Sequence, residues 1–144
     1  MKEFSYALTP FLAWLVAGIL KFLINSLKTR RFAFDLIGYG GLPSNHSAIV
    51  SSIAMLISLK EGVNNPAFGV AIALAFIVIL DASSLRKQVG KHAVAINKLN
   101  SIANDSQSFL RERIGHTRIE ILAGVLTGAA VAYLVYICSF YTLS

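Results

Sequence analysis

The side chains best suited to catalysis in this sequence are two histidines and a glutamate. His116 is followed four residues later by Glu120 at the start of a long apolar run, and His46 stands at the start of another. Residues four apart lie on the same face of a helix. A carboxylate placed there can accept a hydrogen bond from one imidazole nitrogen, which fixes the tautomer and leaves the other nitrogen free as a nucleophile. The pattern predicts nucleophilic chemistry at His116.

His46 belongs to a polar, turn-forming octet, Gly40 to Ser47, set directly against an apolar run. The first turn of a helix leaves backbone N–H groups unpaired and pointing outwards, so a helix that starts here can bind an anion such as phosphate. A histidine at a helix start can equally be a cap or an interfacial residue, and a His and a Glu four apart also occur by chance. Their shared position at span entrances favours a phosphate-handling site.

Membrane-spanning helices are the elements that must position these residues. The chain is 56% hydrophobic and 14% charged, with a mean hydropathy of +0.66, whereas a soluble domain has roughly 25% charged residues. A span needs about 20 residues, and the candidate segments are residues 8–27, 44–59, 66–82 and 119–141. We therefore expect an all-α, polytopic membrane helical bundle of about four transmembrane spans, forming one integral membrane domain over residues 1–144. The first apolar run is interpreted as a retained span, because no small-residue cleavage site follows it.

Basic residues distinguish the connections between the spans. The first and third connections are rich in Lys and Arg, whereas the second holds only Lys60 and Glu61. By the positive-inside rule the first and third loops are cytoplasmic, and both chain ends lie on the other side. The expectation is a protein of a bacterial-type inner or plasma membrane, with its site facing the cytoplasm.

The third connection is long enough to hold further helix. Val89, Ala93 and Ile96 repeat at helical spacing beside Lys91 and Lys98. Residues 84–99 are therefore predicted to continue the third span as one interfacial amphipathic helix. A polar run breaks this helix, and a short helix is expected over about residues 108–114.

Partners and cofactors follow from the same composition. The net charge of +6 lies between apolar segments rather than on a soluble face, so the bilayer and its anionic lipids are expected partners and nucleic acid is not. Cys138 stands alone, which excludes an internal disulfide and a cysteine metal site. No metal or cofactor is expected. Gly124 and Gly128 share a helix face that permits close backbone approach, so a compact bundle and a homodimer are both expected.

Three short motifs follow one another along the chain: Pro43-Ser44-Asn45-His46, Asp81-Ala82 with Arg86-Lys87, and Gly115-His116-Thr117. In this order they resemble the type 2 phosphatidic acid phosphatase and vanadium haloperoxidase superfamily, most closely its small divergent membrane branch. The resemblance covers about residues 20–130. The superfamily has Gly at the position of Asn45 and Asp at that of Glu120.

The resemblance implies a phosphatase that needs no metal. His116 would attack phosphorus and form a phosphohistidine, Glu120 would orient it, and His46 would protonate the leaving oxygen. Ser44, Asn45, backbone N–H groups and cationic side chains would hold the remaining phosphate oxygens.

The cationic residues are less directly implied, because this chain departs from the superfamily pattern. Leu110 stands where the superfamily has its upstream Arg, and Arg86 and Lys87 are the preferred replacements. Lys21, an ionisable residue inside the first span, is expected either to bind phosphate or to reach back to the cytoplasmic end. Asp81 is expected to pair with Arg86 or to position a histidine.

The predicted function is a metal-independent membrane phosphohydrolase acting on a lipid phosphate. Phosphatidylglycerophosphate, phosphatidic acid and an isoprenoid diphosphate are the candidate substrates. The alternative is a small non-enzymatic membrane protein that binds anionic lipid or a partner through its basic cytoplasmic loop. A transporter has less support, because the spans include no paired broken helices.

Overall fold

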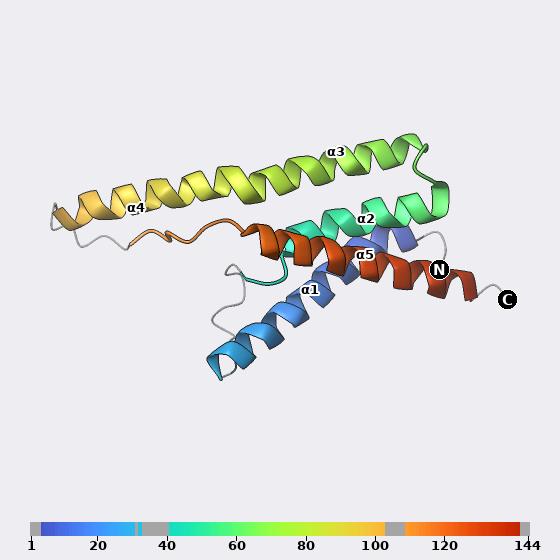
Figure 1. Ribbon diagram of the computed structural model, residues 1–144, viewed down its shortest axis with the longest axis horizontal. Coiled ribbons are helices and arrows are strands. Elements are labelled where there is room, and N and C mark those ends of the chain that lie inside the picture. The colour runs from blue at the N-terminus through green and yellow to red at the C-terminus, as the bar shows by residue number, and fades with distance from the viewer. Residues whose placement is uncertain (1–3, 31, 33–40, 103–108, 142–144) are drawn as a thin grey trace.

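The computed structural model describes residues 4–30, 32, 41–102 and 109–141. All regular secondary structure in these ranges is helical, as the sequence predicts (Figure 1). The elements in chain order are α1 (Ser5–Thr29), α2 (Asn45–Glu61), α3 (Pro66–Leu80), a π-helical turn η2 (Asp81–Leu85), α4 (Arg86–Ile102) and α5 (Arg118–Tyr141).

The α2 helix occupies the centre of the bundle, packed against α1, α3 and α5, and α1 also contacts α5. Both chain ends and the α2–α3 turn lie at one end of the bundle, on the right in Figure 1. The end of α1 and the starts of α2 and α5 lie further to the left. This order of crossings agrees with the topology predicted from the loop charges.

Small side chains build the core. In lipid, apolar burial does not drive helices together, and small residues stabilise a bundle by letting backbones approach closely. One cluster joins α1, α2 and α5, and a second joins α2 and α3. Their buried members are Ala13, Ala17, Ala48 and Val131 in the first, and Ala54, Ile57 and Ala71 in the second.

Gly124 and Gly128 form the closest helix contact, between α5 and α2. A Cβ added at Gly124 would lie 2.4 Å from the Ser44 carbonyl oxygen, and one at Gly128 would lie 2.2 Å from the Ala48 carbonyl oxygen. The Ser51 hydroxyl also donates to the Val125 carbonyl across this contact, at 3.2 Å. The glycine face on which we based a homodimer is therefore occupied within the chain, and the homodimer stays a prediction without that support.

Three helices in the described residues are long and apolar enough to cross a membrane: Ser5–Thr29, Pro66–Ile102 and Arg118–Ser139. They correspond to the first, third and fourth predicted spans. The second predicted span forms α2, which has 17 residues. At a rise of 1.5 Å per residue, α2 is about 25 Å long, slightly shorter than a typical hydrocarbon core of about 30 Å.

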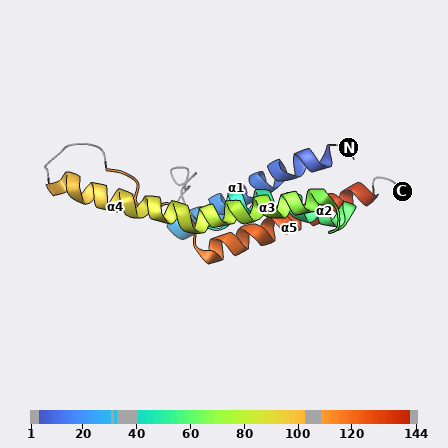
Figure 2. The same cartoon turned by 90° about the horizontal axis from the view of Figure 1, so that it is seen from above.

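The predicted amphipathic helix forms as α4, but it does not turn away from the third span. α3, η2 and α4 run on as one helix of 37 residues, which corresponds to about 55 Å. Figures 1 and 2 show α4 projecting well beyond the other helices, in line with α3. The interfacial location of α4 stays a prediction.

The prediction of a short helix over residues 108–114 is wrong for the part that the structure describes. Residues 109–114 carry no helix and run back along α4 towards the bundle. The Asn97 side chain takes up both the backbone N–H and the carbonyl of Leu110, each at 2.8 Å, so neither group is available to a helical ladder. We call residues 109–115 the strap.

Candidate active site

His116 and Glu120 form the pair that the sequence predicts. The imidazole Nδ1 lies 3.1 Å from Glu120 Oε2, and the two side chains are only 8% and 10% exposed. A carboxylate accepts hydrogen bonds, so it selects the tautomer in which Nδ1 carries the proton. Nε2 then keeps its lone pair and can act as a nucleophile.

Glu120 also stabilises the start of α5. Its Oε2 accepts a hydrogen bond from the Thr117 backbone N–H at 2.9 Å, and its own N–H donates to Thr117 Oγ1 at 3.3 Å. This reciprocal arrangement is a capping box, with Thr117 as the N-cap. The Glu120 carboxylate thus fixes the start of the helix and also orients the His116 imidazole. Both the backbone next to His116 and the His116 ring are held by this one carboxylate.

The His116 backbone is attached to the π-helical turn. Its N–H donates to the Ala82 carbonyl oxygen at 3.0 Å. Gly115, just before it, has φ = +101°, and a Cβ there would lie 3.2 Å from the same oxygen. A residue with a side chain would be strained by this φ and crowded against η2, so glycine is required for the strap to approach this closely.

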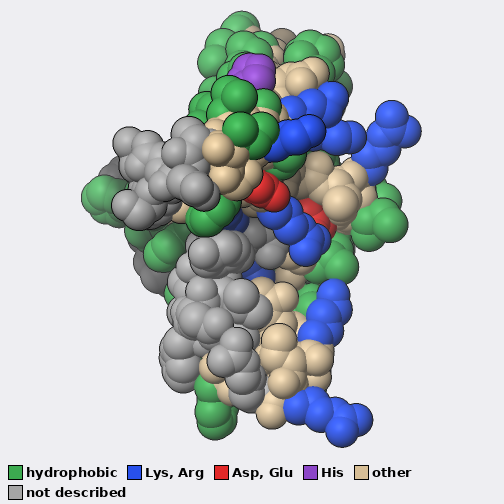
Figure 3. Space-filling model, turned by 90° about the vertical axis from the view of Figure 1, so that its left-hand side faces the viewer, with side chains coloured by type: hydrophobic (Ala, Val, Ile, Leu, Met, Phe, Trp, Pro, Cys, Tyr) green, Lys and Arg blue, Asp and Glu red, His purple; other side chains and the backbone are tan. Residues whose placement is uncertain are grey.

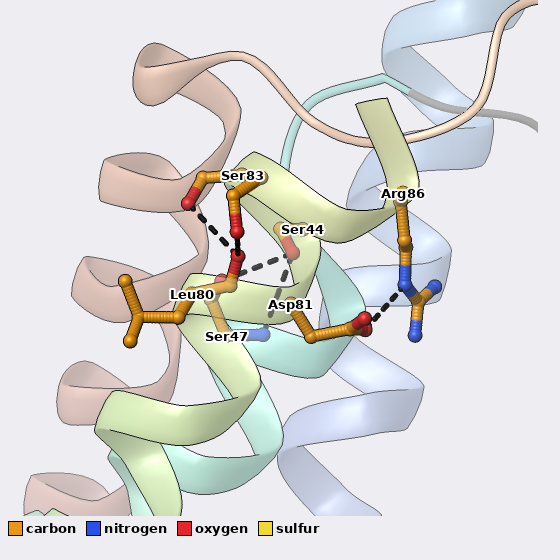
Figure 4. Close-up of polar contacts among 7 residues, drawn as sticks. Ser44, Ser47, Leu80, Asp81, Ser83 and Arg86 are labelled. Carbon is orange, nitrogen blue, oxygen red and sulfur yellow. Dashed lines mark hydrogen bonds and ion pairs between the residues drawn. The ribbon is translucent and has the colours of Figure 1, made fainter. Parts of the chain in front are cut away.

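Two serines and an ion pair accompany the π-helical turn (Figure 4). Ser83 Oγ and Ser84 Oγ both donate to the Leu80 carbonyl, at 3.2 and 2.6 Å, and so satisfy an oxygen whose regular helical partner is displaced. Arg86 Nε lies 2.6 Å from Asp81 Oδ2, as one of the two predicted roles of Asp81 requires. Such π-turns are frequent at functional sites.

His46 faces this pair from the first turn of α2. Its ring centroid lies 6.4 Å from that of His116, with the ring planes inclined by 54°. The rings are too far apart to bond to each other and close enough for one small group to lie between them. The charges of Arg86, Lys21 and Asp81 all act on the His46 imidazole.

Ser44 and Asn45 have different surroundings. Ser44 is fully buried as the N-cap of α2, where its Oγ accepts from the Ser47 N–H at 3.4 Å and its backbone N–H donates to the Glu120 carbonyl at 2.9 Å. Its hydroxyl therefore holds α2 and lies away from any open surface. Asn45 Oδ1 is buried, and no hydrogen bond reaches it from the described residues. Gly40, the first residue of the octet, lies outside those residues.

Lys21 of α1 is buried, with only 8% of the residue exposed. No hydrogen bond to its ammonium occurs within the described part of the chain, and the Glu120 carboxylate is the charge that acts on it most favourably. Burying an ammonium without hydrogen-bond partners costs free energy. A second anion beside Lys21 would reduce that cost.

Burial lowers the pKa of the His116 imidazole. The hydrogen bond to Glu120 opposes this shift, whereas the positive charges of Lys21 and Arg86 reinforce it. His116 is therefore neutral at neutral pH, as a nucleophile must be.

The predicted basic pair divides between two environments. Arg86 is near enough for its charge to act on both histidines, whereas Lys87 is exposed on α4. Lys and Arg side chains spread over the end of the molecule from which α4 projects, with few acidic ones among them (Figure 3). Among the described residues, no group of three or more His, Cys, Asp or Glu side chains could hold a metal ion.

Comparison with known proteins identifies the family. The model of the divergent PAP2 family matches residues 4–131. The chain belongs to this family. The uncharacterized membrane protein YuiD of Bacillus subtilis (strain 168) is 31% identical over 137 residues, which cover 84% of this chain and 87% of YuiD. No solved structure matches the chain. The resemblance to a divergent PAP2 branch is thus confirmed, and the protein is a membrane protein.

The sequence analysis did not predict the roles of several residues that shape this divergent PAP2 site. Thr117 had a readable signal, because Thr-Arg-Ile-Glu is a capping-box pattern. Ala82 contributes a backbone carbonyl, which no side-chain pattern reveals. Gly90 and Asn97 act through contacts with the strap, and nothing in the local sequence predicts those contacts.

Proposed function

We propose that this divergent PAP2 protein is a metal-independent phosphohydrolase that acts on a lipid phosphate through a phosphohistidine. One observation carries the proposal: a buried His116–Glu120 pair, 3.1 Å apart, faces a second histidine at 6.4 Å between ring centroids. A nucleophile oriented by a carboxylate and set opposite a proton donor is the arrangement that covalent phosphoryl transfer requires.

In the first step, the Nε2 lone pair of His116 attacks phosphorus. The bond from phosphorus to the lipid oxygen breaks, and His46 donates a proton to that oxygen. A bound phosphate anion favours the protonated form of His46, because an opposite charge nearby stabilises the imidazolium. The products of this step are the phosphohistidine and a lipid alcohol; from a diphosphate substrate, a lipid monophosphate is released in place of the alcohol.

In the second step, water attacks the phosphohistidine. His46, now neutral, accepts a proton from the water as the P–N bond breaks, and the electron pair returns to His116 Nε2. Inorganic phosphate leaves, and both histidines regain their starting states. Glu120 holds the Nδ1 proton throughout and stabilises the positive charge that the His116 ring carries in the intermediate.

Charge near the phosphate would come from α1, α2 and the start of α4. Lys21 and Arg86 supply positive charge, and the first turn of α2 offers the backbone N–H groups of Asn45 and His46, which lie outside its helical ladder. Charge spreads over the equatorial oxygens as phosphorus transfers, so fixed cations and N–H dipoles there stabilise the transition state. A lipid tail suits this site, because the histidines lie at the ends of helices that are otherwise apolar.

The test is phosphate release by protein purified in detergent. The substrates are phosphatidylglycerophosphate, phosphatidic acid and an isoprenoid diphosphate, each with and without EDTA. We expect release from at least one of them, unaffected by EDTA and abolished in His116→Ala, while His116→Ala keeps its melting temperature. A wild-type protein that releases phosphate from none of them would contradict the proposal and leave the anionic-lipid-binding alternative.

A further inference from the structure

Asn97 is a buried polar residue on α4, only 4% exposed. Its Nδ2 donates to the Leu110 carbonyl at 2.8 Å and to Glu112 Oε1 at 2.9 Å, and its Oδ1 accepts from the Leu110 N–H at 2.8 Å. One amide side chain thus pairs with the strap as a neighbouring strand would. Removing the amide would leave both backbone groups of Leu110 without these partners, which costs free energy for each one that stays buried.

Gly90 lies on the same buried face of α4 as Asn97, seven residues earlier and about 10 Å along the helix. A Cβ at Gly90 would lie 2.5 Å from the Glu112 carbonyl oxygen and 3.5 Å from the Ile114 nitrogen. Both neighbours are backbone atoms, so they cannot move aside as the end of a flexible side chain can. Any side chain at this position must push the strap away from α4.

The strap leads directly to His116, whose backbone N–H donates to the Ala82 carbonyl. Asn97, Gly90 and Ala82 are thus three successive attachment points along one helix. Between them the strap has no helix of its own to fix its path. A displacement at either of the first two points therefore reaches the nucleophile along a chain of a few residues.

We infer that Asn97 and Gly90 are positioning residues for His116, which hold the strap against α4 and so set where the imidazole meets phosphorus. Asn97 lies fifteen residues beyond Ala82, about 22 Å along the helix, and is too distant to touch a phosphate held at His116. Its effect on catalysis, which rests on the proposed function, must therefore fall on kcat and not on KM.

The test compares Gly90→Ala and Asn97→Ala with two controls in detergent. Gly69→Ala adds a methyl group on α3 that meets no described atom within 4 Å, and Gln88→Ala removes an exposed amide from α4. We expect kcat to fall on the order of 10- to 100-fold in the two strap variants, since an error of about 1 Å in a reacting group has that effect. KM should stay within about twofold in all of them.

A second readout does not depend on turnover. The His116 imidazole is titrated by NMR in protein labelled at histidine nitrogens. Freeing the strap exposes the ring, so its midpoint should move towards the ordinary histidine value of about 6.5 in both strap variants and in neither control. Asn97→Asp keeps the acceptor for the Leu110 N–H but turns a carboxylate oxygen towards Glu112 Oε1 and the Leu110 carbonyl, so its midpoint should move at least as far as that of Asn97→Ala. Gly90→Ala, which leaves these hydrogen-bonding groups in place, serves if the Asn97 variants do not fold.

An unchanged His116 titration in folded Gly90→Ala and Asn97→Asp would overturn the inference. The inference would also fail if kcat fell only in proportion to the folded fraction and the folded protein kept its His116 titration. Asn97 and Gly90 would then stabilise the fold without positioning His116. If wild type releases no phosphate, the proposed function fails, and the titration still decides whether Asn97 and Gly90 position His116.

Discussion

Replacing Glu120 with Gln is the most incisive test of the proposed chemistry. Gln is accepted at this capping-box position, and its amide oxygen can still take the Thr117 N–H that Glu120 Oε2 accepts at 2.9 Å. The same Oε2 atom lies 3.1 Å from His116 Nδ1, so an amide oxygen in its place also keeps the hydrogen bond from Nδ1. The tautomer with a free Nε2 lone pair is therefore retained, and the substitution removes the negative charge beside the imidazole.

The phosphohistidine intermediate carries positive charge on the His116 ring, which the Glu120 carboxylate stabilises and a neutral amide does not. A hydrogen bond to a charged group contributes about 1.5–3 kcal/mol, and one between neutral groups about 0.5–1.5 kcal/mol. We expect kcat to fall about tenfold for Glu120→Gln, equivalent to about 1.4 kcal/mol in the activation free energy. The folded state should lose no more than about 1 kcal/mol, because the cap is retained.

The measurement is the initial rate of phosphate release from the best lipid phosphate, together with the melting temperature in the same detergent. Glu61→Gln is the matched control, since Glu61 is a carboxylate near the other end of α2 whose oxygen accepts from the Tyr6 hydroxyl. The control should keep both quantities. A Glu120→Gln variant that kept the wild-type kcat would refute the argument that the Glu120 charge stabilises the phosphohistidine.

Three further predictions concern pH, charge and packing. Burial lowers the pKa of His116, and protonation removes its lone pair, so the loss of kcat/KM that this protonation causes should begin only below about pH 6.5; an acid limb above 6.5 would contradict this. Lys21→Met removes a positive charge from the site, so it should weaken inhibition by vanadate, a phosphate analogue, about tenfold or more; unchanged inhibition would mean that Lys21 does not contact the anion. Gly124→Ala should destabilise the fold by about 1–3 kcal/mol in detergent melts through overpacking, while Gly69→Ala should not; equal melting temperatures would contradict the close α2–α5 contact.

Much of the fold can be predicted from the sequence, because membrane spans and helix caps have local sequence patterns. Long apolar runs predict α1, α3 and α5, and the spacing of His116 and Glu120 predicts their contact. The small residues Gly124 and Gly128 correctly signal a close helix contact. The helix that packs against these glycines cannot be predicted from the sequence, because a small-residue face fits a second copy of the chain as well as another helix of the same chain.

The parts that the sequence does not reveal depend on long-range contacts. Residues 109–114 have a helix-compatible composition, yet Asn97 takes the Leu110 backbone groups and these residues form no helix. The π-helical turn depends on Ser83 and Ser84 and on the docking of Gly115, none of which disturbs hydrophobic periodicity. Ser44 matches a phosphatase motif but is buried as a helix cap, because a serine before a helix serves either purpose with the same residue type.

The shortness of α2 has a consequence for how the protein meets its substrate. With 17 residues, or about 25 Å, α2 is shorter than a hydrocarbon core of about 30 Å, so an α2 that spans the bilayer as predicted would hold His46 near the depth where lipid headgroups join their acyl chains. On the proposed function, a phospholipid need not be extracted from its leaflet and can arrive by lateral diffusion. Turnover should then follow the surface mole fraction of substrate, so adding inert detergent at constant bulk substrate concentration should slow the reaction.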